Sequence, residues 1–399
     1  MDETTAVKRL GGNSLHSSPP SSTYIPLDII QDTILCRLPV KSLLRFRCIC
    51  KPWDFLISKD LKFAKKHLRL SPKRQHLVTT TWREAEELTV MCYPFDSLNL
   101  HSTFNSKATQ LDYSPIIPSE LDGLIASCDG LLCFAIDNRL AVLYNPCIRK
   151  VKKLPYIDLP RVLGSTHYAF GYDPFIDNYK VVAVFFSENY KYNMETIIYD
   201  HVEVHSYTLG TDSWKRIKDF PSRFRFEPFL SKHGIFMRGT VNWLAISDQS
   251  TSYYELDAIV SLHLGRESYQ QISLPELSPF YDDTSRMLRL YVMRDCLCLF
   301  EMLTPESFTD VWLMKEYGNK ESWIKLFRLP CFAYTLCTDI VYISEDDNHV
   351  LLVFRRKIHK FRLVVYDLKN DTITIKSSKT QDNLGMVKSK VHVESLISL

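Results

Sequence analysis

The spacing of apolar residues changes near residue 70, and this change predicts two units of different fold class. Between residues 24 and 70 apolar residues recur at helical intervals. After residue 75 they form short runs rich in Val, Ile, Tyr and Phe, separated by Pro, Asp, Asn and Ser. We therefore expect a small all-α module at 24–70 and an all-β domain at 75–399. Residues 1–23, rich in Ser, Thr and Pro, are expected to be a disordered leader.

Four short helices are expected in the first unit. A capping box at Asp28 and Gln31 begins the first, Pro39 ends it, and Pro52 suits the first turn of the third. The second is expected at 41–49 and the fourth at 61–68. In the fourth, the residues expected on the inner side are Leu61, Ala64 and Leu68, and those expected on a solvated side are Lys62, Lys65 and Lys66.

The helical unit carries more large apolar side chains than about 45 residues of short helices can enclose. These side chains include Leu27, Ile29, Leu43, Leu44, Trp53 and Ile57. Two interpretations are open from the pattern alone. The helices cap the following domain, or their apolar face docks a partner protein.

A repeat of about 55 residues runs through the second unit. Trp214, Tyr269 and Trp323 each follow an apolar strand and a turn, and they lie 55 and 54 residues apart. A period near 50 with about four strands per copy is typical of kelch-type propeller blades. We therefore predict a propeller-like domain of five or six blades, in which 75–115 supplies one blade and a terminal strand closes the ring. A pair of β-sandwiches is the alternative.

Nine apolar runs are expected among about 20 or more strands. They are Leu131–Ile136, Leu140–Tyr144, Lys180–Phe186, Val202–Leu209, Thr240–Ile246, Ala258–Leu264, Leu288–Met293, Cys296–Met302 and His349–Phe354. Alternation in the fifth run places Val241 and Trp243 on one face, which we expect to lie in the core.

The charge distribution supports the same division of the chain. Residues 1–75 carry 14 Lys and Arg against 6 Asp and Glu, whereas the remainder carries 35 against 40. The net charge of only +3 argues against a nucleic-acid partner. The longest apolar runs, 131–136 and 181–186, are far shorter than the roughly 20 residues of a membrane-spanning helix, so no membrane partner is expected.

The cysteine content points to a reducing compartment. The chain has 11 Cys, an odd number, and no apolar segment of a secretory signal near Met1. Free thiols are therefore expected, together with a cytoplasmic or nuclear location.

Motifs of catalysis and metal binding are missing from the sequence. It has no Walker loop, G-x-G-x-x-G, G-x-S-x-G, H-E-x-x-H or C-x-x-C. Weaker candidates are read as structural: Cys48 and Cys50 on a helix, Cys296 and Cys298 on a buried strand, His201 and His205 on one strand face, and Glu345–Asn348 as a charged turn. No catalytic, cofactor or metal residue is assigned, and no cofactor is expected.

The helical unit closely resembles the F-box motif. The matching stretch runs from Ile25-Pro26-Leu27-Asp28 through Leu35-Cys36-Arg37-Leu38-Pro39-Val40-Lys41-Ser42 to Cys50-Lys51-Pro52-Trp53. It departs only slightly, with Ile25 and Ile29 in place of Leu and Pro52 where Ser is common. The resemblance implies docking to the Skp1 adaptor and, through it, to the cullin of an SCF ubiquitin ligase. The residues it assigns to Skp1 binding are Pro26, Leu27, Ile29, Ile30, Ile34, Leu35, Leu38, Pro39, Val40, Lys41, Leu43, Leu44 and Trp53.

The second unit resembles the F-box-associated region of plant F-box proteins, which include pollen S-locus determinants and regulators of immune receptors. The matching phrases include Cys128-Asp129-Gly130-Leu131, Tyr144-Asn145-Pro146 and Gly239-Thr240-Val241-Asn242-Trp243. The Gly-Gly pairs of kelch repeats are absent from it. The resemblance implies a non-catalytic subunit that binds a protein target for ubiquitination and degradation. The alternatives are an F-box protein that acts outside the ligase and a copper enzyme built on a propeller.

Overall fold

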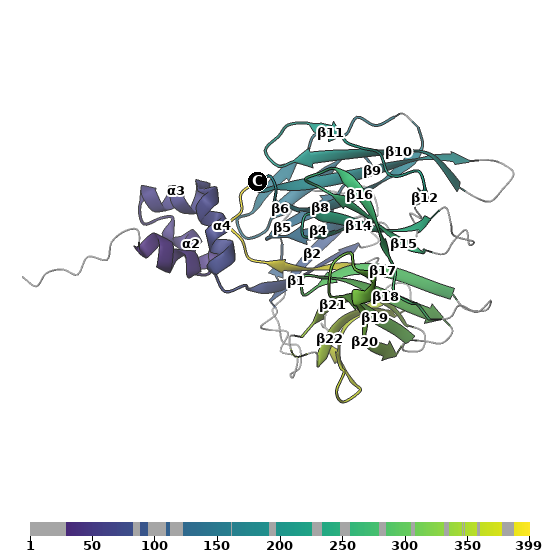
Figure 1. The fold of residues 1–399 in the computed structure, drawn as a ribbon. Coiled ribbons are helices and arrows are strands. Elements are labelled where there is room, and N and C mark those ends of the chain that lie inside the picture. Colours follow the sequence, from purple (N-terminus) through teal and green to yellow (C-terminus); the bar gives the residue numbers. More distant parts are fainter. Residues whose placement is uncertain are drawn as a thin grey trace, which may run out of the picture.

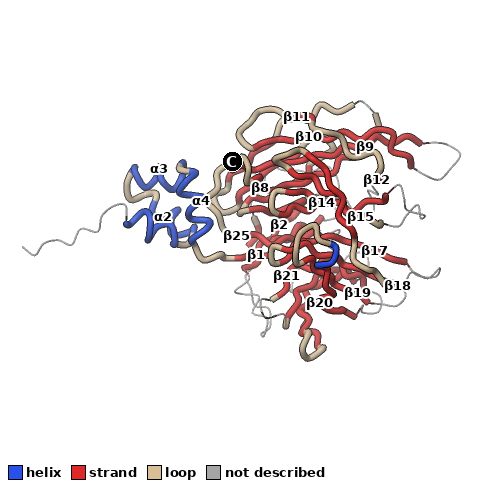
Figure 2. The backbone as a smooth tube through the Cα atoms, in the orientation of Figure 1, coloured by secondary structure: helices blue, strands red, loops and turns tan. Residues whose placement is uncertain are grey.

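The computed structural model contains a small helical unit beside a larger β domain (Figure 1). It describes residues 29–82, 88–94, 109–111, 123–160, 162–190, 197–225, 234–247, 256–278, 285–304, 308–330, 335–344, 346, 348–356, 360–376 and 387–399. Figure 2 shows the main helices gathered at one end and strands throughout the rest. The expected fold class, an all-α module followed by an all-β propeller-like domain, is confirmed. The leader, Pro26 and Leu27 lie outside the described residues.

The helical unit consists of five short elements. They are the π-helical turn η1 (Ile30–Ile34), the 3-10 turn η2 (Leu35–Arg37), α2 (Val40–Phe46), α3 (Lys51–Lys59) and α4 (Leu61–Leu70). The single regular helix expected at 28–38 is therefore wrong within its described part. The second helix ends at Phe46, three residues early, and the exposed Cys48 and Cys50 lie between helices rather than on one. Asp60 caps α4 by accepting a hydrogen bond from the Phe63 amide.

The expected faces of α4 are confirmed for Ala64 and Lys62 and are wrong for Leu61 and Lys65. Phe63, Ala64 and His67 form its buried side, whereas Leu61 is 49% exposed. The Lys65 side chain is not solvated, because its Nζ atom lies 2.7 Å from Oδ2 of Asp177 in the β domain. The helix thus turns one side toward η2 and another toward the β domain.

The β domain is a ring of six antiparallel sheets, with a short 3-10 turn, η4 (Lys320–Ser322), beside one of them. The first three sheets contain β25 (Val387–Val393), β1 (Gln75–Trp82), β2 (Leu88–Pro94) and β3 (Thr109–Gln110); β4 (Leu124–Cys128), β5 (Leu131–Ala135), β6 (Ala141–Asn145) and β7 (Lys150–Lys153); and β8 (Gly164–Asp173), β9 (Asn178–Tyr190), β10 (Ile197–Thr208) and β11 (Trp214–Arg216). The other three contain β12 (Phe224–Arg225), β13 (Ile235–Met237), β14 (Thr240–Ser247), β15 (Ala258–His263) and β16 (Ser268–Ser273); β17 (Ser285–Met293), β18 (Cys296–Thr304), β19 (Phe308–Met314) and β20 (Trp323–Pro330); and β21 (Thr335–Ile343), β22 (His349–Arg356), β23 (Lys360–Asp367) and β24 (Thr372–Lys376). The strands β4, β8, β13, β17, β21 and β25 line a central cavity, which makes each sheet a propeller blade.

The repeated aromatic residues occupy equivalent places, as the 55-residue period predicts. Trp214, Tyr269 and Trp323 all lie at the start of the outermost strand of their blade. Each donates a hydrogen bond to a main-chain carbonyl of the preceding blade, at Pro155, Lys218 and Ser273 respectively, over 2.7 to 3.0 Å. The repeat therefore ties neighbouring blades together. The β-sandwich alternative is wrong.

The C-terminal strand closes the ring. β25 pairs with β1 in antiparallel register from Gln75 and Val393 to Thr81 and Val387. After β25 the chain reaches Ser395 and Ile397, whose carbonyls accept hydrogen bonds from the Asn145 side chain at 3.2 and 2.8 Å. The two ends of the β domain thus form one blade, and the last residues of the chain are fixed to the next blade.

Two histidines meet where the ring closes. His76 on β1 lies opposite His392 on β25, and its Nε2 atom is 3.3 Å from Oε1 of Glu394. Burial and the neighbouring His76 lower the pKa of His392 to about 3. Burial also opposes the charge of His76, but hydrogen bonds with Cys92 and Glu394 outweigh it and raise the pKa of His76 to about 9.

We expect this closure to lose stability on both sides of a pH near 6.5. Below the ordinary histidine pKa of about 6.5, the unfolded chain protonates His392 but the folded chain does not, so stability falls with pH. Above it, the folded chain retains a proton on His76 that the unfolded chain releases, so stability falls as pH rises toward 9. Urea unfolding at pH 4.5–6.5 should show a shallower pH slope for His392→Gln than for the parent, by up to about 1.4 kcal/mol per pH unit. Equal pH slopes for the parent and His392→Gln would refute the lowered pKa of His392.

Candidate docking surface and helix–propeller junction

The centre of the helical unit is a small apolar core. Leu35, Val40, Leu43, Ile57 and Phe63 are all at most 5% exposed. Three of these residues, Leu35, Val40 and Leu43, belong to the set assigned to Skp1 binding. In this structure they support the surface from beneath and do not themselves lie on it.

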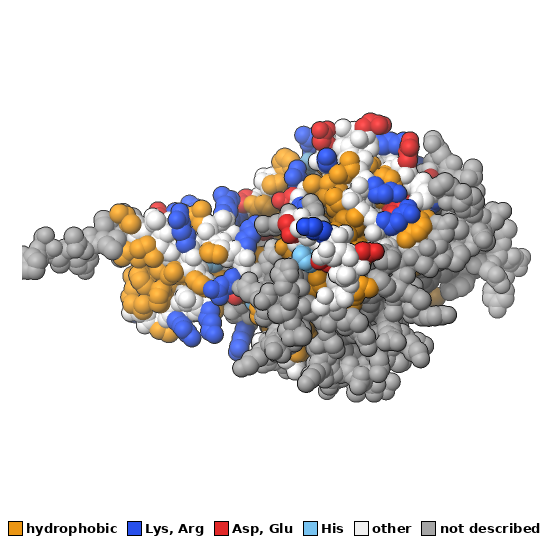
Figure 3. Space-filling view, turned by 90° about the horizontal axis from the view of Figure 1, so that it is seen from below, with side chains coloured by type: hydrophobic (Ala, Val, Ile, Leu, Met, Phe, Trp, Pro, Cys, Tyr) orange, Lys and Arg blue, Asp and Glu red, His pale blue; other side chains and the backbone are white. Residues whose placement is uncertain are grey.

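Most of the other assigned residues are accessible. Ile29, Ile34 and Lys41 are exposed, while the partly exposed residues are Ile30, Leu38, Pro39, Leu44 and Trp53. Figure 3 shows hydrophobic side chains gathered at the end of the helical unit that lies away from the propeller. Their role in docking stays a prediction.

Two exposed apolar side chains were missed by the sequence reasoning. Ile49, in the turn after α2, is 61% exposed, and Phe55 on α3 is 65% exposed. Both lie within or just beyond the matching motif, and their exposure in a unit with its own core is the signal for partner docking. Packing of Phe46 on Trp53, with ring centroids 5.8 Å apart, holds α2 against α3 beneath them.

His67 is a third residue that the sequence reasoning missed. Its side chain is 1% exposed, and its Nε2 atom lies 2.8 Å from the carbonyl oxygen of Leu38. Burial lowers its pKa, so the neutral ring with a proton on Nε2 is the form that donates to this carbonyl. His67 therefore fixes the backbone at Leu38, directly before Pro39.

The helical unit packs on one face of the propeller. Asp129 and Asp177 lie in the turns between the first and second strands of two blades, and both turns face α4. Lys65 pairs with Asp177, and its Nζ atom lies 5.7 Å from the centroid of the Tyr172 ring. Buried side chains of the helices and of the propeller form one continuous apolar cluster, which also contains Leu396. The helices thus contact the propeller, as the cap interpretation predicts, and still expose apolar side chains, whose docking to a partner stays a prediction.

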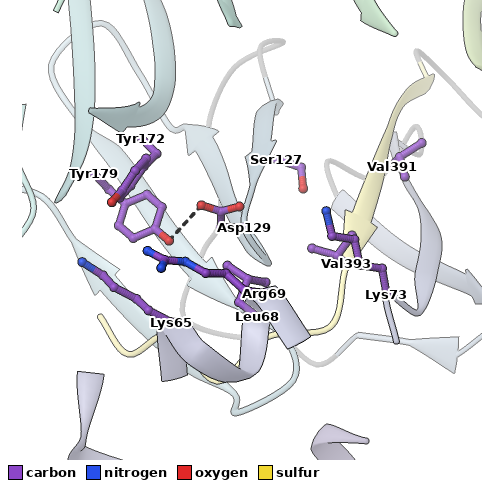
Figure 4. A pocket seen from close by; sticks show the side chains of 10 residues that line it. All are labelled: Lys65, Leu68, Arg69, Lys73, Ser127, Asp129, Tyr172, Tyr179, Val391 and Val393. Carbon is purple, nitrogen blue, oxygen red and sulfur yellow. Dashed lines mark hydrogen bonds between the residues drawn. The ribbon is translucent and has the colours of Figure 1, made fainter. Parts of the chain in front are cut away.

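A pocket lies within this junction (Figure 4). Its lining comprises Lys65, Leu68, Arg69, Lys73, Ser127, Asp129, Tyr172, Tyr179, Val391 and Val393. The Tyr179 hydroxyl donates to Oδ2 of Asp129 over 3.1 Å. Burial raises the pKa of Asp129, against the lowering effect of this hydrogen bond.

The weaker chemical candidates are placed as follows. Cys298 is buried on β18, Cys296 lies partly exposed beside it, and the Cys residues whose side chains the structure describes are free thiols. His205 lies 3.0 Å from Glu203, whereas the side chain of His201 lies outside the described set. Within the part of the chain that the structure describes, no three His, Cys, Asp or Glu side chains converge as a metal site. No helix in that part is long and apolar enough to cross a membrane.

Comparison with known proteins places the chain in a family. The model of the F-box associated beta propeller domain matches residues 85–399. An F-box/kelch-repeat protein of Arabidopsis thaliana is 31% identical over 389 residues, which are 94% of this chain and 95% of the relative. The F-box protein CPR1 of the same plant is 28% identical over 388 residues, which are 92% and 88% of the two chains. The chain therefore belongs to the family of proteins that carry an F-box associated beta propeller domain.

Proposed function

We propose that the chain is the substrate-recognition subunit of an SCF ubiquitin ligase. Its relatives are F-box proteins with a propeller domain, which implies such a role in general. The observation that carries the proposal is the set of exposed apolar side chains on the motif-bearing helical unit, which a solvated cap would not need. The Skp1-like adaptor would dock there, and a protein target would bind the propeller.

Such a subunit would act through proximity. Holding a target near a ubiquitin-charged enzyme converts a bimolecular encounter into an effectively unimolecular one. The Lys65–Asp177 ion pair and the shared apolar cluster join the helical unit to the propeller, so a bound target would keep a defined position relative to the adaptor. In this proposal no side chain of the chain itself performs chemistry.

The test is reconstitution with purified adaptor and cullin. We expect the full chain to retain the adaptor on a column and to recruit cullin only when the adaptor is present. Capture of the adaptor without cullin would favour the alternative function, in which an F-box protein acts outside the ligase. Absence of adaptor binding would overturn both.

Two substitutions should distinguish a residue of the docking surface, which affects adaptor binding, from a residue of the helical core, which affects stability. Phe55→Ala removes an exposed ring, so we expect a change in unfolding free energy within about 0.5 kcal/mol but weaker adaptor capture. Leu43→Ala opens a cavity in the helical core and should cost about 2–5 kcal/mol. Urea unfolding and adaptor titration of both variants decide the assignment. A Phe55→Ala variant with parental affinity would remove Phe55 from the surface.

A further inference from the structure

The junction pocket has the size of a small-molecule site. Its volume is about 510 Å³, within the range of about 300–1,000 Å³ that ligand pockets occupy. One wall comes from α4 and the segment after it, and the other comes from the propeller (Figure 4). A molecule bound here would touch both units. Ser127 and Val391 also line the central cavity, so the pocket lies at one mouth of that cavity.

Three cationic side chains lie along the helical wall, and they face two carboxylates, Asp129 and Asp177. Lys65 is already neutralised by Asp177, 2.7 Å away. In the described ranges neither Arg69 nor Lys73 makes a close ion pair, but the charge of Arg69 acts on Asp177 and that of Lys73 on Asp129. Figure 4 shows the Arg69 guanidinium directed toward the tyrosine pair of the opposite wall.

The opposite wall offers hydroxyl groups and a single carboxylate. Asp129 is the only acidic residue among those that line the pocket, and it accepts the Tyr179 hydroxyl. The Tyr172 hydroxyl donates to Asp177, which leaves Asp129 as the acceptor for a hydroxyl group of a ligand. Three cations against two carboxylates leave a positive excess among the described residues here, so the pocket suits an anion that also carries hydroxyl groups.

We propose that this pocket binds a small phosphorylated metabolite, with its phosphate on the cationic wall that carries Arg69 and Lys73 and a hydroxyl group on Asp129. The planar guanidinium of Arg binds phosphate through two parallel hydrogen bonds, and Lys adds a point charge. Because the ligand bridges both units, binding stabilises their relative orientation. The proposal is independent of the proposed function, because it rests on the residues of the pocket and its test involves no adaptor.

Calorimetric titration of the full chain with pyrophosphate, at constant ionic strength, tests the phosphate position. We expect saturable binding by the parent, and binding weaker by about tenfold or more in the double variant Arg69→Gln/Lys73→Gln. The matched control Lys51→Gln/Lys62→Gln removes two exposed charges from the same helical unit outside the pocket, and it should bind as the parent does. Absence of saturable binding by the parent, or equal losses in both double variants, would show non-specific attraction and overturn the proposal.

Asp129→Asn gives a test of opposite sign. Pyrophosphate carries no alcohol group for Asp129 to accept, so removing the negative charge should tighten its binding. Weaker binding by Asp129→Asn, in a variant with the parental melting temperature, would contradict the expected repulsion between this carboxylate and the bound phosphate, and the proposal would be wrong.

Discussion

Replacing Leu38 and Pro39 together by Ala is expected to abolish capture of the adaptor. Both residues are partly exposed, and they lie between η2 and α2, where the backbone turns. Pro39 occupies the position before the first residue of α2, and His67 anchors the Leu38 carbonyl from below. Interface energy concentrates in a few anchors worth about 2 kcal/mol or more each. Loss of two such anchors, roughly 4 kcal/mol, weakens binding about a thousandfold.

The control for this prediction is a double variant on the propeller. Val162→Ala/Leu163→Ala removes two exposed apolar side chains, 55% and 73% accessible, from a segment outside the helical unit. It should capture the adaptor as the parent does, while both double variants keep the circular dichroism of the parent. Adaptor capture by Leu38→Ala/Pro39→Ala at parental affinity would show that the helical unit is only a cap on the propeller.

The buried cores of the helical unit and of the propeller are continuous. Helical residues such as Val40 and Ala64 share one buried cluster with Leu131 on β5 of the propeller. A substitution inside the helical core therefore affects the propeller as well. Leu38 and Pro39 suit the test because neither is fully buried.

Sequence periodicity was most informative where a structural unit repeats. All nine expected strands are present within the described residues, and Trp214, Tyr269 and Trp323 occupy equivalent positions. Each blade must bury the same kind of side chain in the same place, so the spacing alone identifies the blade. The number of blades required the three-dimensional structure, because the closing blade joins residues more than 290 positions apart, such as Gln75 and Val393.

Periodicity was least informative in the helices. The helical period marked Leu61 as internal, but α4 turns Phe63, Ala64 and His67 inward because η2 and the propeller occupy two of its sides. Local propensity likewise predicted one helix at 28–38, where tertiary packing imposes a π-helical and a 3-10 turn.

The junction pocket was beyond sequence reasoning for the same physical reason. Lys65 and Arg69 come from α4, whereas Asp129 and Tyr172 follow them by about 60 and 100 residues. Nothing in the local pattern around any of these residues marks a shared site. Lysines of an amphipathic helix are usually solvated, and only the position of the propeller makes Lys65 an exception.

Trp243→Ala is expected to destabilise the propeller by about 3–5 kcal/mol. The Trp243 ring on β14 is 1% exposed, as the alternation with Val241 predicted. It lies in the apolar cluster between two blades, edge-on to Phe220 with ring centroids 6.1 Å apart. Truncation to Ala would leave a cavity that neighbouring strands cannot fill, because both of the adjacent blades are fixed by their own hydrogen-bonded sheets.

The backbone around Trp243 shows how closely this site is packed. A Cβ atom added at Gly234 would lie 2.6 Å from Cε2 of the Trp243 ring, so the chain uses glycine there to admit the indole. Gly234→Ala should therefore overpack the same site and lower the free energy of unfolding by about 1–3 kcal/mol. Tyr156→Ala, which removes a ring that is 69% exposed, is the control and should unfold at the parental urea midpoint. A Trp243→Ala variant that also unfolds at the parental midpoint would show that the indole does not support the contact between these two blades.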